Sequence, residues 1–301
     1  MSPALAHYRE FAPCEALRDS VRAFFSFAPP EPRPARRRIG REVRFGVGDP
    51  FCSPVFADGH LSLVCSLGRD YRADGLWHLD PAGPRATAIG PMTAVGPADF
   101  AGRAHVVGAY FHPARAFLFT RAPASEMTDR VRSLRDLWGR PAAELLNGIG
   151  EADCEEERID RLESALLLRM RQVQAPNTNL NVRGLAAYVQ RRCGGVAVKL
   201  LADAAGVSRQ HLTRTFRESV GVCPKTYCRL ARFQAGLAFT RRGPQVDWAQ
   251  AAAEMGYADQ SHMIAEFRRF SSLTPGVLAS RRWFHPFIER ARDSIFPIAR
   301  H

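Results

Sequence analysis

The last third of this 301-residue sequence repeats itself with an offset of 50 to 51 residues. A period in this range usually marks a duplicated supersecondary unit, so we expect two copies of one local structure here. The matching positions are Gly206-Val207 and Gly256-Tyr257, Ser208 and Asp259, Leu212 and Met263, Phe216 and Phe267, and Pro224 and Pro275.

Each copy predicts two helices joined by a short turn. An Ala-rich helix, at residues 200–205 or 248–255, precedes a glycine that favours a turn with positive φ. Ser208 and Asp259 can then accept hydrogen bonds from the free amides that open the second helix. Apolar residues four apart give that second helix one inward-facing stripe. This is the plan of a helix-turn-helix unit, whose second helix enters the major groove of DNA.

The positive charge of the chain is concentrated in the same region. Residues 181–301 hold 19 Lys and Arg against 8 Asp and Glu, whereas residues 1–180 hold 23 against 22. Such an asymmetry is typical of proteins that bind a polyanion, because phosphate contacts release counterions and supply affinity. A solvated basic surface without a partner has the same composition and remains the alternative.

Two stretches of sequence resemble the DNA-binding domain of the AraC/XylS family of bacterial regulators. They read LADAAGVSRQHLTRTFRESVGVCPKTY and AAAEMGYADQSHMIAEFRRFSSLTP, and the likeness runs from about residue 179 to 283. It implies seven helices, with two helix-turn-helix units bridged by a long helix at residues 226–240. One chain would then address two major-groove segments roughly 34 Å apart. The implied function is sequence-specific transcription regulation, with no enzymatic activity, catalytic residue or cofactor.

The resemblance also assigns the residues that face the DNA bases. It places the first recognition helix at residues 209–218 and starts the second at Gln260. Arg can bond guanine and Gln adenine in bidentate fashion, and Thr can meet a thymine methyl group. The second copy has Ala265 where the family often has arginine, so we expect it to anchor DNA more than read it. The expected base-contacting residues are Arg209, Gln210, Thr213, Arg214, Gln260, Ser261, His262 and Ile264.

Basic residues beside these helices are candidates for phosphate contacts. For any single one, a solvated surface role is the alternative interpretation. The candidates are Arg217, Lys225, Arg229, Arg268, Arg269, Arg281 and Arg282.

The chain is long enough for two domains, and its two parts differ in the secondary structure that their sequence patterns predict. We expect an α+β fold class, with a strand-rich, β-barrel-like N-terminal domain that carries a helical appendage, followed by an all-α domain. The expected boundaries are residues 1–172, a linker at 173–181 and a DNA-binding domain at 182–301, with helix-turn-helix units at about 198–218 and 247–270. Strands are expected at 43–47, 61–67, 86–95 and 104–111, and helices at 113–121, 141–147 and 155–173.

The N-terminal part offers fewer functional signals. The stretches PVFADGHLSLVCSL and GAYFHPARAF resemble the N-terminal domains of an uncharacterised subgroup of these regulators. By analogy with the family, we expect this part to sense a small-molecule effector or to mediate homodimerisation, with no effector-binding residue assigned. The expected partners of the whole chain are double-stranded promoter DNA and RNA polymerase.

Metal binding and redox sensing are alternatives for the cysteines and histidines of this part. Cys52, His60, Cys65 and His78 could gather around a metal, but their spacing matches no zinc pattern. Scattered buried cysteines and satisfied histidines are the simpler interpretation, so we expect no metal. A cysteine could instead sense oxidants, although no neighbouring residue in the sequence marks a thiolate of low pKa.

Two other functions share a DNA-binding domain of this kind. A DNA-alkylation-repair methyl acceptor would resemble its relatives in a four-cysteine zinc cluster and a Pro-Cys-His-Arg motif, and the sequence contains neither. A nonspecific architectural DNA binder is the second alternative. The seven scattered cysteines favour a reducing cytoplasm, and the sequence shows neither a signal peptide nor an apolar run that predicts membrane contact.

Overall fold

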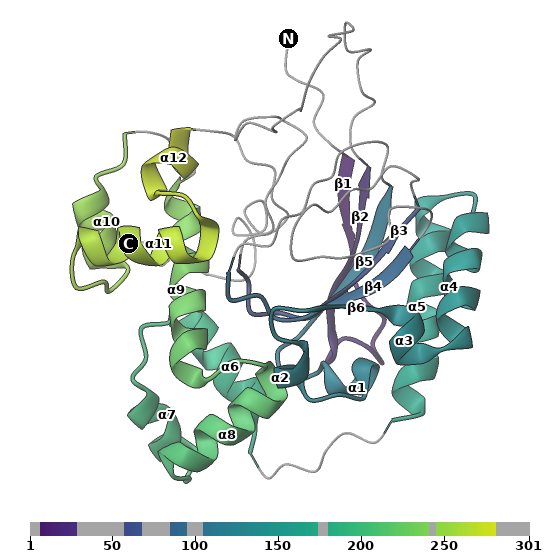
Figure 1. Cartoon of the computed structure of the whole chain (residues 1–301), viewed down its shortest axis with the longest axis horizontal. Coiled ribbons are helices and arrows are strands. Elements are labelled where there is room, and N and C mark those ends of the chain that lie inside the picture. Colours follow the sequence, from purple (N-terminus) through teal and green to yellow (C-terminus); the bar gives the residue numbers. More distant parts are fainter. Residues whose placement is uncertain are drawn as a thin grey trace, which may run out of the picture.

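The computed structural model describes residues 7–28, 57–67, 85–94, 105–173, 180–240 and 245–280. Within these residues a sheet with helices α1–α5 forms one body, and helices α6–α12 form a second body beside it (Figure 1). The strand expected at residues 43–47 lies outside the described residues.

Six strands form one antiparallel sheet in the order β1-β2-β5-β3-β4-β6. Strands β5 and β3 lie at its centre, and every residue of β5 is buried. Among the described strands, β1 and β6 form the two edges of the sheet. The bounds are β1 His7–Phe11, β2 Val21–Ala28, β3 Ser62–Ser66, β4 Arg85–Ile89, β5 Val106–Phe111 and β6 Val131–Ser133.

Strands β3 and β5 fall inside the expected ranges, and β4 overlaps only the start of the expected range 86–95. Strands β1, β2 and β6 were not predicted. In β2, the adjacent residues Phe24 and Phe25 are both buried, each in a different apolar cluster on its own side of the strand. A strand buried on both faces loses the alternation of apolar and polar residues by which strands are predicted.

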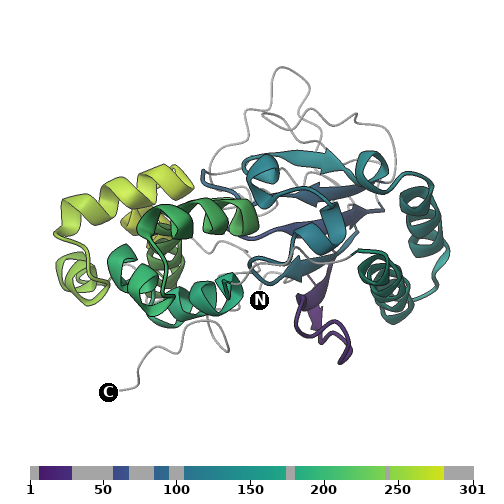
Figure 2. The same ribbon diagram turned by 90° about the horizontal axis from the view of Figure 1, so that it is seen from below.

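Helices α3, α4 and α5 pack beside the sheet and form the expected helical appendage (Figure 2). The core between them includes a stack of Phe111 on Phe119, with ring centroids 4.4 Å apart. Trp138 Nε1 donates to the carbonyl of Phe119 at 2.7 Å. The bounds are α1 Phe117–Thr120, α2 Ala124–Met127, α3 Leu134–Trp138, α4 Arg140–Glu151 and α5 Glu155–Arg171.

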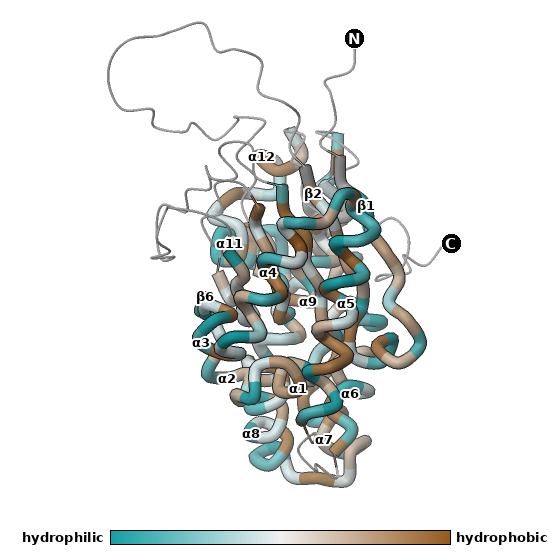
Figure 3. Tube along the Cα trace, turned by 90° about the vertical axis from the view of Figure 1, so that its right-hand side faces the viewer, coloured by the Kyte–Doolittle hydropathy of each residue, from teal (hydrophilic) through white to brown (hydrophobic). Residues whose placement is uncertain are grey.

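Residues 180–240 and 245–280 contain seven helices, the number that the resemblance implies. Along α8, as along α5, hydrophilic and hydrophobic residues alternate within each turn (Figure 3), which is typical of a helix with one buried face. The 17-residue helix α9, about 25 Å long, bridges the two halves of this body. The bounds are α6 Val182–Arg191, α7 Val198–Ala204, α8 Arg209–Val220, α9 Pro224–Thr240, α10 Trp248–Glu254, α11 Gln260–Ser271 and α12 Pro275–Ser280.

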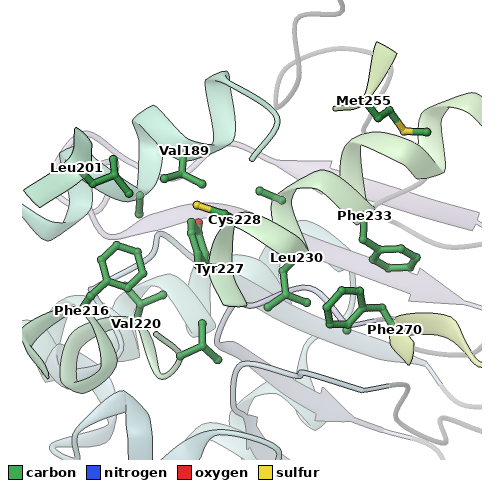
Figure 4. Close-up of a cluster of buried hydrophobic side chains, with 14 of the residues drawn as sticks. Val189, Leu201, Phe216, Val220, Tyr227, Cys228, Leu230, Phe233, Met255 and Phe270 are labelled. Atoms are coloured by element: carbon green, nitrogen blue, oxygen red, sulfur yellow. The ribbon is translucent and has the colours of Figure 1, made fainter. Parts of the chain in front are cut away.

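A single apolar core joins both halves of the helical body (Figure 4). At one end of α9, Tyr227 meets Phe216 of α8 edge-on, with ring centroids 5.4 Å apart. Further along α9, Phe233 contacts Phe267 and Phe270 of α11 at 5.1 and 5.4 Å. Because α9 supplies side chains to both halves, its conformation fixes where α8 lies relative to α11.

Candidate nucleic-acid interface

The first repeat folds as two helices, α7 and α8, joined by a four-residue turn. Gly206 in this turn has φ +64°, and the hydroxyl of Ser208 accepts from the backbone N–H of His211 at 3.1 Å. Leu212 and Phe216 are fully buried on the inner face of α8. The turn, the cap and the apolar stripe predicted for this copy are therefore confirmed.

The second repeat follows the same plan with α10 and α11. Gly256 has φ +71°, and the carboxylate of Asp259 accepts from the backbone N–H of His262 at 2.7 Å. Met263 and Phe267 are fully buried, as their counterparts are in the first repeat. The helix starts and the inward stripe of this copy are confirmed as well.

The outer face of α8 presents the four side chains assigned to base contacts. Arg209, Gln210, Thr213 and Arg214 are all exposed. The hydroxyl of Thr213 donates to the carbonyl of Arg209 at 2.7 Å, so the methyl group is the part of this side chain that remains available. These four residues offer the donors, acceptors and methyl group with which proteins distinguish base pairs in the major groove.

The outer face of α11 is less polar than that of α8. Gln260, Ser261 and His262 are exposed, whereas Ile264 is half-buried. The ring of His262 contacts Tyr257 edge-on, with centroids 5.5 Å apart, which orients the imidazole. Ala265, in the position where arginine is common in the family, is exposed and offers no hydrogen bond.

Four of the seven phosphate candidates are exposed cations near these helices. They are Arg217, Lys225, Arg268 and Arg269. Arg281 and Arg282 lie outside the described residues. The interface thus keeps a set of basic side chains on both repeats, as phosphate binding requires.

Arg229, unlike the other described phosphate candidates, has an internal partner that the sequence did not indicate. Its Nε donates to both carboxylate oxygens of Glu266 at 3.0 and 2.9 Å, and its Nη2 donates to Oε1 as well. The Glu266 side chain is 7% exposed and that of Arg229 27% exposed. Hydrogen bonding to Glu266 raises the pKa of Arg229. The guanidinium is engaged in an internal ion pair, so a phosphate contact by Arg229 would share the guanidinium with Glu266.

The expected metal candidates do not form a cluster in the part of the chain that the structure describes. His60 faces Gln190, and Cys65 is fully buried in β3, where burial raises the pKa of its thiol to about 12. Cys52 and His78 lie outside the described residues. No group of three or more His, Cys, Asp or Glu residues capable of holding a metal occurs among the residues described.

Cys223 of the DNA-binding domain, outside the N-terminal part that was considered for redox sensing, has a lowered pKa. It directly precedes α9, where burial raises its pKa but hydrogen bonds from Thr226 and from backbone amides outweigh that effect, so the pKa is lowered. The Cys223 Sγ and Thr226 Oγ1 atoms are 3.3 Å apart. The sequence signal that could have indicated this is a cysteine just before the first turn of a predicted helix.

Comparison with known families assigns the two bodies separately. Residues 201–281 match a helix-turn-helix domain family, and residues 9–133 match a domain of unknown function, DUF6597. No curated protein matches the chain significantly. Within the described residues, no helix has the length and apolar character needed to cross a membrane.

Among solved structures, several of ToxT from Vibrio cholerae are similar to this chain. The crystal structure from strain O395 is 9% identical, covers 77% of this chain and 94% of that chain, and has a TM-score of 0.37. The unsaturated fatty acid-bound form is 11% identical, with 74% and 87% covered and a TM-score of 0.40. The complex with (E)-4-(8-methylnaphthalen-1-yl)but-3-enoic acid is 10% identical, with 76% and 92% covered and a TM-score of 0.41.

Proposed function

We propose that this chain, which carries an AraC-type helix-turn-helix domain in its last third, is a sequence-specific DNA-binding regulator of transcription. One observation carries the proposal: two capped recognition helices, α8 and α11, are held on one core by α9 and present exposed polar faces. A single chain built this way can occupy two successive turns of the major groove.

The two units have unequal tasks. On α8, Arg214 and its exposed neighbours supply the bidentate groups that read base edges. On α11, Ile264 and Ala265 offer no such groups, while Arg268 and Arg269 are exposed for phosphate contacts. The first unit therefore reads the sequence, and the second anchors the domain on the backbone.

The sheet domain senses a small-molecule effector or pairs two copies of the chain. Support comes from its own apolar core, which is separate from the core of the helical domain, and from its match to a different family. RNA polymerase is the partner through which a promoter-bound regulator of this kind acts, in the cytoplasm.

A selection experiment tests the DNA-binding proposal. The full chain is incubated with randomised duplexes at near-physiological salt, and the bound fraction is sequenced after several rounds. We expect an enriched motif with two conserved windows about 10 base pairs apart, one of which shows the stronger base preference. A bound pool without an enriched motif would instead favour the nonspecific architectural binder.

A further inference from the structure

A four-residue segment of the sheet domain, Ala57 to His60, lies against the helices of the DNA-binding domain. The backbone N–H of Ala57 donates to the carbonyl of Phe270 in α11 at 3.3 Å. The carbonyl of Ala57 accepts from the side-chain amide of Gln234 in α9. The segment thus forms hydrogen bonds with both the bridging helix and the second recognition helix.

Close backbone contact at Gly59 brings the segment directly onto α9. Gly59 has φ +67°, and a Cβ atom there would lie 3.2 Å from Leu230 Cδ1 and 3.5 Å from the ring of Tyr227. Leu230 and Tyr227 both belong to the core shared by the two helix-turn-helix units. A side chain at position 59 would therefore press on the helix that sets the placement of those units.

The far end of the segment reaches the first half of the domain. His60 Nε2 lies 3.3 Å from the side-chain amide of Gln190 in α6. The carboxylate of Asp58 accepts from the backbone N–H of His60 at 3.0 Å, which holds the segment in a tight turn. All three contact sites, on α6, α9 and α11, are thus fixed by one short, internally bonded turn.

The segment continues directly into the centre of the sheet. Leu61 follows His60, and its carbonyl accepts from the backbone N–H of Phe111 in β5 at 3.1 Å. Strand β3 begins at the next residue and pairs with both β4 and β5. A displacement of these central strands would therefore be transmitted to α9 without an intervening loop.

This contact leaves the DNA-facing residues free. Arg209, Arg214 and Arg268 are exposed while the segment is in place, so the described part of the sheet domain leaves these three side chains accessible. The segment can act only on how the two units are held relative to each other. Holding them in place lowers the entropic cost of engaging two groove segments at once.

We propose that residues 57–60 are a clamp through which the sheet domain fixes the spacing of the two helix-turn-helix units and so controls their joint binding to DNA. This inference rests on the proposed function. The clamped state is the one that binds two windows tightly, and a signal that shifts β3 loosens it.

The test compares two glycine variants at positions with nearly the same positive φ. Gly59→Ala introduces a methyl group against Leu230. Gly139→Ala, at φ +68° and with no atom within 4 Å of the added Cβ, places an alanine at a positive φ outside the clamp. Gln234→Leu is a second clamp variant, which keeps the side-chain volume and removes the bond to Ala57. Circular dichroism and thermal unfolding establish that each full-length variant is folded.

Binding is measured to the duplex that the wild-type chain enriches from a random pool and to the same duplex with one base pair inserted between its windows. The wild type and Gly139→Ala should lose roughly tenfold in affinity on the insertion. Gly59→Ala and Gln234→Leu should bind the original duplex more weakly and lose less than about threefold on the insertion, because loosened units adapt to the new spacing.

If all four proteins lose affinity to the same extent on the insertion, the clamp proposal is overturned. If Gly59→Ala does not fold, Gln234→Leu decides alone, and wild-type discrimination by that variant overturns the proposal. Failure of the wild-type chain to enrich any duplex is a separate result, because it contradicts the proposed function before the clamp is tested.

Discussion

Arg229 of the bridging helix and Glu266 of the second recognition helix form an ion pair in which the guanidinium contacts both carboxylate oxygens. The guanidinium also lies over the ring of Phe270, 5.6 Å from its centroid. This pair places two opposite charges at the junction of α9 and α11 inside the DNA-binding domain. Its geometry suits a positioning role, because the carboxylate of Glu266, whose side chain is only 7% exposed, holds the guanidinium against α11.

Removal of one member of this pair should destabilise the fold. We expect Arg229→Ala to lower the free energy of unfolding by about 2–4 kcal/mol, because Glu266 would remain buried without its partner. Arg229→Ala/Glu266→Leu should recover most of that loss, since no unpaired charge is left. Denaturant unfolding of the three proteins measures both effects. If Arg229→Ala kept wild-type stability and instead lowered the salt dependence of DNA binding, the phosphate role would be favoured.

Asp58 should make the stability of the chain depend on pH. Burial raises the pKa of this carboxyl from 3.8 to about 7. Hydrogen bonds from the backbone N–H groups of His60 and Met92 and the charge of Arg22 favour the ionised form, but their effect on the pKa is smaller than that of burial. A carboxyl whose pKa is raised on folding contributes stability at low pH that is lost as the pH rises through the folded pKa. The wild type should therefore lose stability relative to Asp58→Asn between about pH 4 and 7, by on the order of 2–4 kcal/mol.

Paired unfolding measurements isolate this effect from other titrating groups. Burial lowers the pKa of His112 to about 4, with the nearby charges of Arg183 and Arg22 acting in the same direction. His112 therefore contributes stability that is lost as the pH falls, opposite in sign to Asp58. It is present in both proteins and cancels in the difference. A difference that stays flat from pH 4 to 8 would rule out the raised pKa of Asp58.

The helix caps Ser208 and Asp259 should make similar contributions to the free energy of unfolding. We expect Ser208→Ala and Asp259→Ala each to cost about 1 kcal/mol, because each leaves a backbone N–H at a helix start without its acceptor. Ser208→Gly should cost only a few tenths of a kcal/mol. Thermal unfolding monitored by circular dichroism gives the comparison. Equal losses for the alanine and glycine variants of Ser208 would show that the hydroxyl does not cap α8.

The local features of the DNA-binding domain were predictable because each has a signal in nearby residues. A glycine, a capping residue and an apolar pair four apart identified both turns, and α8 and α11 begin at Arg209 and Gln260 as expected. Helices α2 and α3 have four and five residues, so they are too short for a helical period to be visible.

The long-range features were not predictable from spacing. Glu266 and Arg229 are 37 positions apart, and each has the sequence signature of an ordinary surface charge. Gln234 and Ala57 are 177 positions apart, on different domains. These pairs are set by how helices and domains pack, and a single sequence carries no local pattern that reports such packing.

Sequence reading by α8 is tested by comparing Arg214→Ala with Arg268→Ala on the enriched duplex and on a scrambled duplex, over a range of salt concentrations. Arg214→Ala should cost about 1–3 kcal/mol on the enriched duplex and leave binding to the scrambled duplex unchanged. Arg268→Ala should weaken both duplexes alike and reduce the salt slope by about 1. An equal loss on both duplexes for Arg214→Ala would contradict the claim that α8 reads the sequence.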